Sequence, residues 1–211
     1  MQKSMIRYLT ISFLALALLV SCGSNPVKEL PSVAVQSPVF ENKYFSDPGF
    51  DYVYKTNISV YGNDLSGIVI VKKIKGNAHR VVFTTDFGNK LLDFEISEND
   101  FKVNSIVEEL DRKILINTLR EDFRLLLREK FQIESQFENE TDNILESKDK
   151  KKYNYLFVSK NGKKLHKIVH SSKRKEKLSI IFQSENNIFA DNITIQHQNI
   201  KLKITLNYLK N

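Results

Sequence analysis

Cysteine, tryptophan and long apolar runs are scarce in this chain of 211 residues. It has one cysteine and no tryptophan, so no disulfide can form within the chain and stability must come from a packed core. All four prolines lie between Pro26 and Pro48, which leaves the rest free of the residue that interrupts helices and sheets. No apolar run reaches the roughly 20 residues that a membrane-spanning helix requires.

The lone cysteine follows the longest apolar run. Lys3 and Arg7 are the only charges before Cys22, and residues 8–20 are nearly all apolar. A positive start, a short apolar core and small residues at its end are typical of a secretory signal. The four residues LVSC, which end at Cys22, resemble the lipobox of bacterial lipoproteins. The resemblance implies a signal peptide over residues 1–21 and acyl chains on Cys22, which would anchor the protein to a membrane. The alternatives are a cleaved, unacylated secretory protein and an uncleaved signal anchor.

The chain after the cysteine divides into a tether and one domain. Prolines and polar residues predict a tether over residues 22–48, whose later part, Val33 to Phe45, can lie against the domain. Residues 49–211 are long enough to form a single domain with a real core. A hydrophobic content of 41%, with 14 Phe and 8 Tyr, indicates a globular chain rather than a disordered one.

Hydrophobic periodicity predicts strands first and then a helix. Alternating apolar and polar residues predict five short strands between Asp51 and Val107, and their up-and-down order predicts antiparallel pairing. Helical spacing then predicts a helix from Asp111 to about Lys130, with Asp111 as its N-cap. The stripe that carries this spacing consists of Leu115, Leu119, Phe123 and Leu126.

A polar stretch and a second group of strands follow. Residues 134–152 predict a loop or a frayed hairpin. About five more strands come next, and Asn161-Gly162 predicts a tight hairpin between the first two. The predicted fold class is therefore mainly β with α: a curved antiparallel sheet, an unclosed β-barrel, covered by one or more helices.

Several predicted strands are apolar on both faces, as in GIVIV and RVVF. One face can pack under the helix, and the other must be covered or must serve in binding. A curved sheet with a helix across it could enclose an apolar groove for acyl chains, and the alternative is a core with no cavity. The strand pattern gives as groove candidates Ile58, Val60, Ile68, Ile70, Val81, Phe83, Leu92 and Phe94.

Charge is divided unevenly along the chain. Residues 22–149 hold 16 basic and 22 acidic residues, whereas residues 150–211 hold 14 basic and 3 acidic ones. A basic face could meet anionic lipid headgroups or an acidic partner, and the alternative is a solvated hairpin that aids solubility. No nucleic-acid-binding motif is present, so nucleic acid is not an expected partner. The candidates for headgroup contact are Lys163, Lys164, Lys167, Lys173, Arg174 and Lys175.

Motifs for catalysis and cofactor binding are missing. The sequence has no nucleophile elbow, P-loop, dinucleotide glycine pattern or HExxH, so we predict neither enzymatic activity nor a cofactor. His166 and His170 are expected to share a face but lack a third ligand, so we predict no metal site. Asp93 and Glu95 share a strand face, and a single pair of this kind is more typical of a solvated surface than of acid–base catalysis.

The stretch LSGIVIVKKIKGNAHRVVFTTDFGNKLLDFEI, residues 65–96, resembles the central strands of the LolA/LolB superfamily, the lipoprotein carriers and receptors of Gram-negative bacteria. Ser66-Gly67 stands at the family's step into a strand, and Phe87 to Leu91 stand at its turn. Residues 187–209 resemble the closing strands. The resemblance implies an unclosed antiparallel barrel with helices as a lid, an apolar cavity for lipid chains, and attachment to the outer membrane facing the periplasm.

These observations lead to one functional prediction and one alternative. We predict a membrane-anchored, periplasmic, monomeric lipoprotein that binds lipid or lipoprotein acyl chains without catalysis, in the setting of lipoprotein localisation to the outer membrane. The alternative is a non-catalytic accessory lipoprotein that holds a protein partner of the cell envelope through its sheet edge or its basic hairpin.

Overall fold

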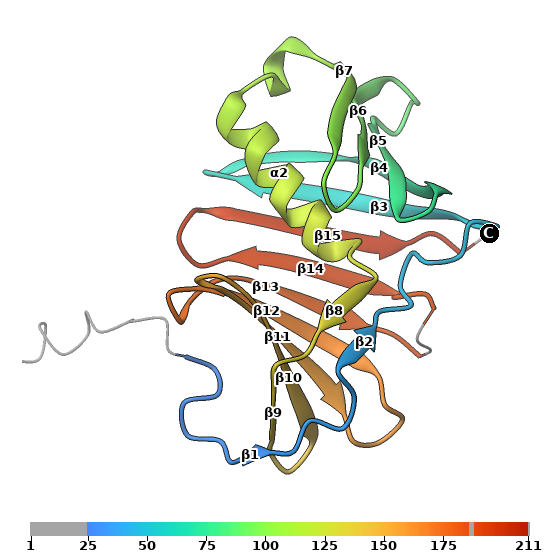
Figure 1. Ribbon diagram of the computed structural model, residues 1–211. Helices are drawn as coiled ribbons and strands as arrows, with labels where there is room; N and C mark the ends of the chain where they lie inside the picture. Colours follow the sequence, from blue (N-terminus) through green and yellow to red (C-terminus); the bar gives the residue numbers. More distant parts are fainter. Residues whose placement is uncertain (1–24, 186–187, 211) are drawn as a thin grey trace, which may run out of the picture.

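The computed structural model describes residues 25–185 and 188–210 (Figure 1). In these residues, thirteen strands form one antiparallel sheet in the order β1-β9-β10-β11-β12-β13-β14-β15-β3-β4-β5-β6-β7, and β2 pairs with β8 in a second, small sheet. Cys22 and the predicted signal peptide lie outside the described residues. No helix in the described ranges has the length and apolar character needed to cross a membrane.

The strands of the large sheet are β1 Ser32–Val33, β3 Asp51–Val60, β4 Asn63–Lys75, β5 Ala78–Thr84, β6 Lys90–Ile96, β7 Phe101–Ile106, β9 Ser135–Glu138, β10 Asp142–Asp149, β11 Lys152–Ser159, β12 Leu165–Ser172, β13 Lys175–Gln183, β14 Asn192–His197 and β15 Leu202–Tyr208. The small sheet consists of β2 Val39–Glu41 and β8 Lys130–Gln132. The helices are the short 3₁₀ helix η1 Glu108–Leu110 and the α-helix α2 Lys113–Leu126.

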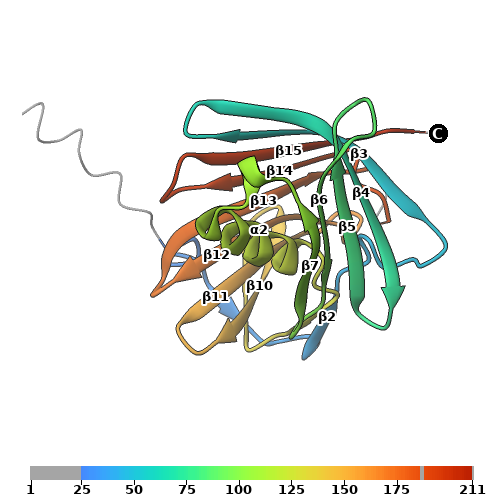
Figure 2. The ribbon, with the colours of Figure 1, turned by 90° about the horizontal axis from the view of Figure 1, so that it is seen from above.

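The large sheet curls around α2 but does not close, because β1 and β7 remain as its two edges (Figure 2). The helix lies across one half of the inner face, and the β2–β8 pair lies across the other half (Figure 1). The predicted fold class, an unclosed antiparallel barrel covered by a helix, is confirmed. The five strands between Asp51 and Val107 and their antiparallel order are also as predicted.

The helix is shorter than predicted, and its predicted N-cap is wrong. It runs from Lys113 to Leu126, and Arg112 occupies the N-cap position without a side-chain hydrogen bond. Asp111 instead ends η1, where its backbone N–H donates to the carbonyl of Glu108. Because of the 3₁₀ turn, the α-helix begins two residues later than predicted. Helical periodicity does not distinguish a 3₁₀ turn from the first turn of an α-helix.

Residues 134–152, predicted as a loop or a frayed hairpin, form the antiparallel hairpin of β9 and β10 over most of their length, so the loop alternative is wrong. Two buried polar side chains of β10 have partners beyond the adjacent strand β11, on β12 and in the β12–β13 turn. Asp142 bonds to His166 Nε2 at 2.8 Å, and Glu146 pairs with Arg174 at 3.6 Å. Such cross-strand pairs stabilise a strand that hydrophobic alternation does not identify.

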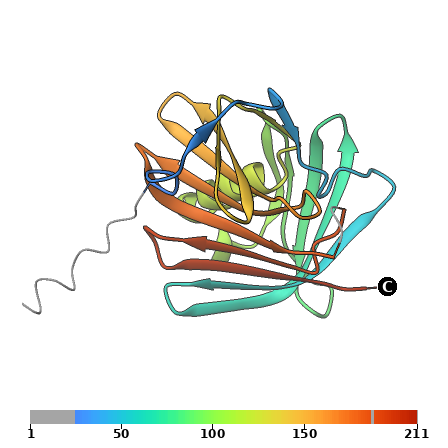
Figure 3. The same ribbon diagram turned by 90° about the horizontal axis from the view of Figure 1, so that it is seen from below.

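The N-terminal segment, residues 25–47, packs against the sheet on both of its faces, and we call it the strap. Val27 is 4% exposed and packs on the outer face against Ile144, Tyr155 and Val169. The strap then extends the sheet edge as β1, next to β9, and continues as β2 over the inner face (Figure 3). The sequence leads us to expect contact only from Val33 to Phe45, so the packed part begins earlier than expected.

Candidate functional site

The inner face of the curled sheet carries the large apolar core, and strand register decides which predicted groove residues belong to it. Val81 pairs with Val71 and Phe94, and Phe83 pairs with Val69 and Leu92. Six of the eight candidates share this face, namely Ile58, Val60, Val81, Phe83, Leu92 and Phe94.

Ile68 and Ile70 alternate with Val69 and Val71 along β4 and therefore lie on the outer face. The prediction that all eight candidates line one groove is wrong for these two. The segment GIVIV is apolar on both faces, so its pattern does not show which residues point inward.

The chain itself covers much of the inner face. The Phe94 ring meets Phe123 of α2 edge to face, with centroids 5.5 Å apart. The Tyr44 ring of the strap stacks on Phe182 with centroids 4.6 Å apart, and its hydroxyl donates to the Leu165 carbonyl at 3.0 Å. The helix and the strap therefore occupy the place where a ligand of an open sheet would lie.

A cavity of about 400 Å³ remains at the rim, between the second half of α2, the β6–β7 turn and the β10–β11 turn. Its apolar lining comes from Ile96, Leu125, Leu127 and Leu178, each less than a tenth exposed. Charged side chains surround this apolar lining, among them Glu121, Arg124, Arg128, Asp149 and Lys152. The volume lies within the range of small-molecule sites, and an apolar lining with a charged rim suits an amphiphile.

None of the eight groove candidates lines this cavity. Sequence patterns did not indicate its lining, because it combines α2 with the β4–β5 and β6–β7 turns and with strands of the second half of the chain. Two signals were present: Asn154 and His170 are polar residues at inner-face positions of strands whose neighbours are apolar. Their pairing across β11 and β12 is a matter of register, which the sequence does not show.

His170 and Asn154 form the polar wall of the cavity. The Nδ1 atom of His170 lies 2.7 Å from Asn154 Oδ1. Burial, assisted by the nearby charge of Lys152, lowers the pKa of His170 to about 4, from an ordinary value of 6.5. The ring is therefore neutral at neutral pH.

We expect the protein to lose stability as the pH falls from about 6.5 to about 4. Over this range the unfolded chain takes up a proton at His170 and the folded chain does not, so protonation favours the unfolded state by up to about 3 kcal/mol. Urea unfolding followed by circular dichroism across this range measures the effect. The variant His170→Gln should have a shallower dependence but not a flat one, because burial also lowers the pKa of His79. An unchanged slope in the variant would contradict the assignment.

A buried hydrogen-bonded pair fixes α2 to the sheet beside the cavity. Asp122 of α2 is 1% exposed, and its two carboxylate oxygens lie 2.8 and 3.0 Å from Nε2 of His197 on β14. Burial raises the pKa of Asp122, and the bond to His197 opposes the rise. The pair holds the helix in position over the inner face.

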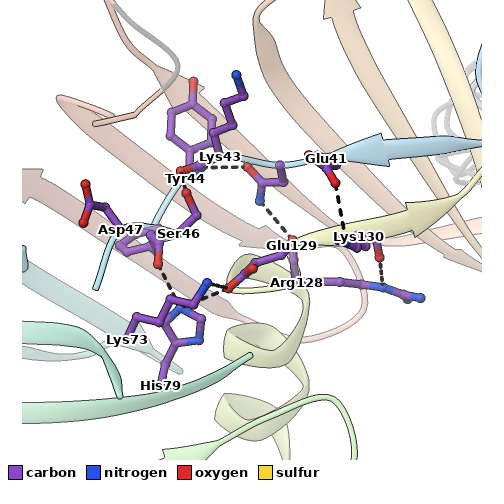
Figure 4. A network of polar contacts seen from close by, with 12 residues as sticks. Glu41, Lys43, Tyr44, Ser46, Asp47, Lys73, His79, Arg128, Glu129 and Lys130 are labelled. Atoms are coloured by element: carbon purple, nitrogen blue, oxygen red, sulfur yellow. Dashed lines mark hydrogen bonds and ion pairs between the residues drawn. The ribbon is translucent and has the colours of Figure 1, made fainter. Parts of the chain in front are cut away.

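A second polar network closes the opposite side of the cavity and joins the strap to the end of the helix (Figure 4). The side-chain Nδ2 of Asn42 donates to the Arg128 carbonyl at 3.1 Å, and the backbone N–H of Asn42 donates to the Glu129 carbonyl at 2.7 Å. The Glu129 carboxylate pairs with Lys73 Nζ at 2.6 Å. His79 Nε2 lies 2.9 Å from the Phe45 carbonyl. Strap, helix end and the β4–β5 hairpin are thus held together by polar bonds.

The predicted headgroup residues do not form one surface. Lys163 and Lys164 lie at the β11–β12 turn, whereas Lys173, Arg174 and Lys175 lie at the β12–β13 turn, at the other end of β12. Eight residues of strand separate the two groups by roughly 26 Å. Lys167 is on the outer face between them, over the Phe157 ring at 5.2 Å. The continuous basic stretch in the sequence is therefore split by the length of one strand.

The other candidate groups take structural roles. Asp93 is 1% exposed and accepts two bonds from Arg80 and one from Lys90, which together hold its pKa well below its usual range. His166 bonds to Asp142 on the outer face, and His170 bonds to Asn154 on the inner face, because a bulge in the β11–β12 pairing breaks the alternation. The expectation that the two histidines share a face is wrong. In the described ranges, no three metal-binding side chains converge.

No protein-family model matches the sequence, and no curated protein sequence matches it significantly. Solved structures do resemble it. A LolA-superfamily protein from Nitrosomonas europaea superposes with a TM-score of 0.51 at 13% identity, over 78% of this chain and 86% of that one. A domain described as an outer membrane lipoprotein-sorting protein from Vibrio parahaemolyticus gives a TM-score of 0.44 at 9% identity, over 76% of this chain and 83% of that one. A DUF1329 family protein from Desulfovibrio piger gives a TM-score of 0.43 at 9% identity, over 76% of this chain and 84% of that one.

The Nitrosomonas structure shows that this chain has the LolA-like fold. The resemblance that the sequence indicates over residues 65–96 is therefore confirmed at the level of the fold. A fold alone does not specify an activity, so the function must be argued from the cavity and from the surface of the molecule.

Proposed function

We propose that this protein is a non-catalytic, membrane-anchored lipoprotein that binds the acyl chains of a lipid or a lipoprotein in the cavity between α2 and the curled sheet. The observation that carries the proposal is the cavity of about 400 Å³ with an apolar lining and a charged rim. An acyl chain would lie against the apolar side chains, and a polar headgroup would remain among the charged ones.

The covering elements suit a site that opens and closes. The helix and the strap are joined to the sheet and to each other by a few polar contacts, which include the Asp122–His197 pair and the Asn42 bonds to the end of the helix. Displacement of these elements would extend the cavity along the apolar inner face. We propose that a longer acyl chain is accommodated in this way.

The cellular setting follows from the sequence and from the fold. The signal and lipobox pattern around Cys22 supports acylation and anchoring to a membrane, and the LolA-like fold supports a role in the periplasm at the outer membrane. The Vibrio domain named above is described as lipoprotein-sorting, and we propose the same general setting for this chain. A protein partner in the cell envelope is the alternative.

Filling the cavity should remove bound lipid. Leu178 lines the cavity and is 5% exposed, so Leu178→Trp places a larger side chain in the acyl site. We expect the fraction of purified protein that carries lipid in native mass spectrometry to fall by roughly tenfold, which corresponds to about 1.4 kcal/mol. Ile181→Trp is the matched control, because Ile181 is 40% exposed on the outer face of the same strand.

Two results would count against lipid binding. One is a wild-type protein, purified from cells without refolding, that carries no lipid at all. The other is equal loss of lipid in both tryptophan variants. Unfolding of the Leu178 variant is detected by circular dichroism, and Leu178→Phe then repeats the test with a smaller ring.

A further inference from the structure

We propose that one end of the sheet, formed by the β10–β11 and β12–β13 turns, is the face that lies on an anionic membrane surface. We call this the basic end and define it as residues 148–152 and 173–175. The inference rests on the proposed anchoring at Cys22 and goes beyond it, because it states which way the domain faces.

The basic end is a single surface although its two parts are far apart in the sequence. Lys152 pairs with Ser172 across the two strands, and the backbone amide of Lys173 donates to the Lys151 carbonyl at 2.9 Å. Its eight residues comprise seven basic ones and one acidic one, and all eight are exposed. The predicted headgroup residues include the second turn but not the first, because the first lies in the polar stretch predicted as a loop or a frayed hairpin.

Aromatic and cationic side chains are combined at this end in a way that suits lipid headgroups. The Arg174 guanidinium lies 4.7 Å from the centroid of the half-buried Tyr153 ring, and Lys148 Nζ lies 5.9 Å from the same centroid. Tyrosine rings and long basic side chains are favoured at the headgroup level of a bilayer, because each has an apolar body and a polar tip. Each lysine or arginine close to an anionic surface adds to the attraction.

The start of the strap brings the predicted anchor to the same end. Val27 packs against Tyr155 and Val169 on the outer face. The described part of the strap begins on the side of the sheet where the two turns lie (Figure 3). The chain from Cys22 to Asn25 is three residues long and can span at most about 11 Å. Acyl chains on Cys22 would therefore hold the bilayer near the basic end and not near the β11–β12 turn at the other end of these strands.

The cavity opens toward this end too. Asp149 and Lys152 belong to the basic end and also line the cavity. A membrane in contact with these residues would lie beside the cavity rim. The orientation thus provides a short path for an acyl chain between bilayer and cavity.

Hydrogen–deuterium exchange of the full, acylated protein in vesicles tests the orientation. One set of vesicles is phosphatidylcholine alone, and the other contains phosphatidylcholine and phosphatidylglycerol in equal parts. We expect the amides of the basic end to exchange roughly tenfold more slowly on the anionic vesicles, since several lysines would contact the surface. Amides of the β5–β6 turn, residues 85–89, should exchange equally on both.

Charge reversal supplies the matched comparison. Lys151→Glu with Lys175→Glu should abolish the slower exchange at the basic end. The control variant Lys75→Glu with Lys102→Glu changes the net charge by the same amount at exposed sites on β4 and β7. The basic end of this control should still exchange more slowly on the anionic vesicles. If the reversal variant is poorly folded, as judged by exchange in β14 and β15, Lys151→Gln with Lys175→Gln replaces it.

Equal exchange on both kinds of vesicle would overturn the proposal, and so would equal loss of protection in the two charge-reversal variants. Native mass spectrometry of the same preparations reports lipid in the cavity and acyl chains on Cys22 separately. Failure of the orientation is therefore distinguishable from failure of the proposed function.

Discussion

Replacement of His197 by alanine is expected to lower the free energy of unfolding by about 3–5 kcal/mol. The substitution leaves the Asp122 carboxylate, which is 1% exposed, without the ring that lies 2.8 Å away. A buried charge without a partner costs far more than the pair contributes when it is intact. Urea unfolding followed by circular dichroism measures the loss.

An exposed ion pair provides the control for this prediction. Glu41 and Lys130 lie 3.5 Å apart with side chains 63% and 68% exposed, so Glu41→Gln should change stability by less than about 1 kcal/mol. Asp122→Asn in the His197→Ala background should restore part of the loss, because a neutral amide is less costly to bury. If His197→Ala costs no more than Glu41→Gln, the pair does not hold the helix.

Gly67→Ala is expected to destabilise the protein by about 3 kcal/mol or more. A β-carbon at Gly67 would lie 2.0 Å from the Thr84 carbonyl oxygen and 2.8 Å from the Phe83 ring. The first contact is with the backbone of the neighbouring strand, which cannot move without breaking the β4–β5 pairing. The steric conflict therefore cannot be relieved by a rotamer change.

Two neighbouring substitutions separate this steric effect from general effects of alanine. Ser66→Ala removes an exposed hydroxyl that donates to Asn57 Oδ1 at 3.0 Å, so its effect should be within about 1 kcal/mol. Gly62→Ala introduces a side chain into open space at a φ of +86° and should cost about 1 kcal/mol from backbone strain alone. If the Gly67 variant is as stable as these two variants, β4 does not lie as close to the Thr84 carbonyl of β5 as the structure indicates.

The sequence predicted most of the architecture because hydrophobic periodicity is a local property. The alternation in β3, β5 and β6, the turn at Asn161-Gly162 and the helical stripe around Phe123 each depend on residues close together in the chain. The prediction was least definite where partners are distant. In the strand of residues 142–149, Asp142 and Glu146 find His166 and Arg174 beyond the adjacent strand β11, and no local pattern shows those partners.

The candidate site was harder to predict than the fold. Ile68 and Val69 are equally apolar, and only pairing with Tyr54 and Phe83 places Val69 inward and Ile68 outward. The cavity is formed by residues from six separate parts of the chain, from Asn77 to Leu178. Its lining therefore depends on how the sheet curls around α2, and periodicity contains no information on that curvature.

The sequence by itself determined that this chain is a β-rich domain that depends on its core, with a charge excess in residues 150–211 and a lipoprotein-like start. It also supported the LolA-like resemblance, because the order of strands and turns depends on residues that are close together in the chain. Only the tertiary structure decided that the basic residues divide between two ends of β12 and that one of these ends joins Lys151 to Lys173. The physical reason is that a strand keeps the two ends of a sequence stretch apart, while sheet pairing brings turns from different hairpins together.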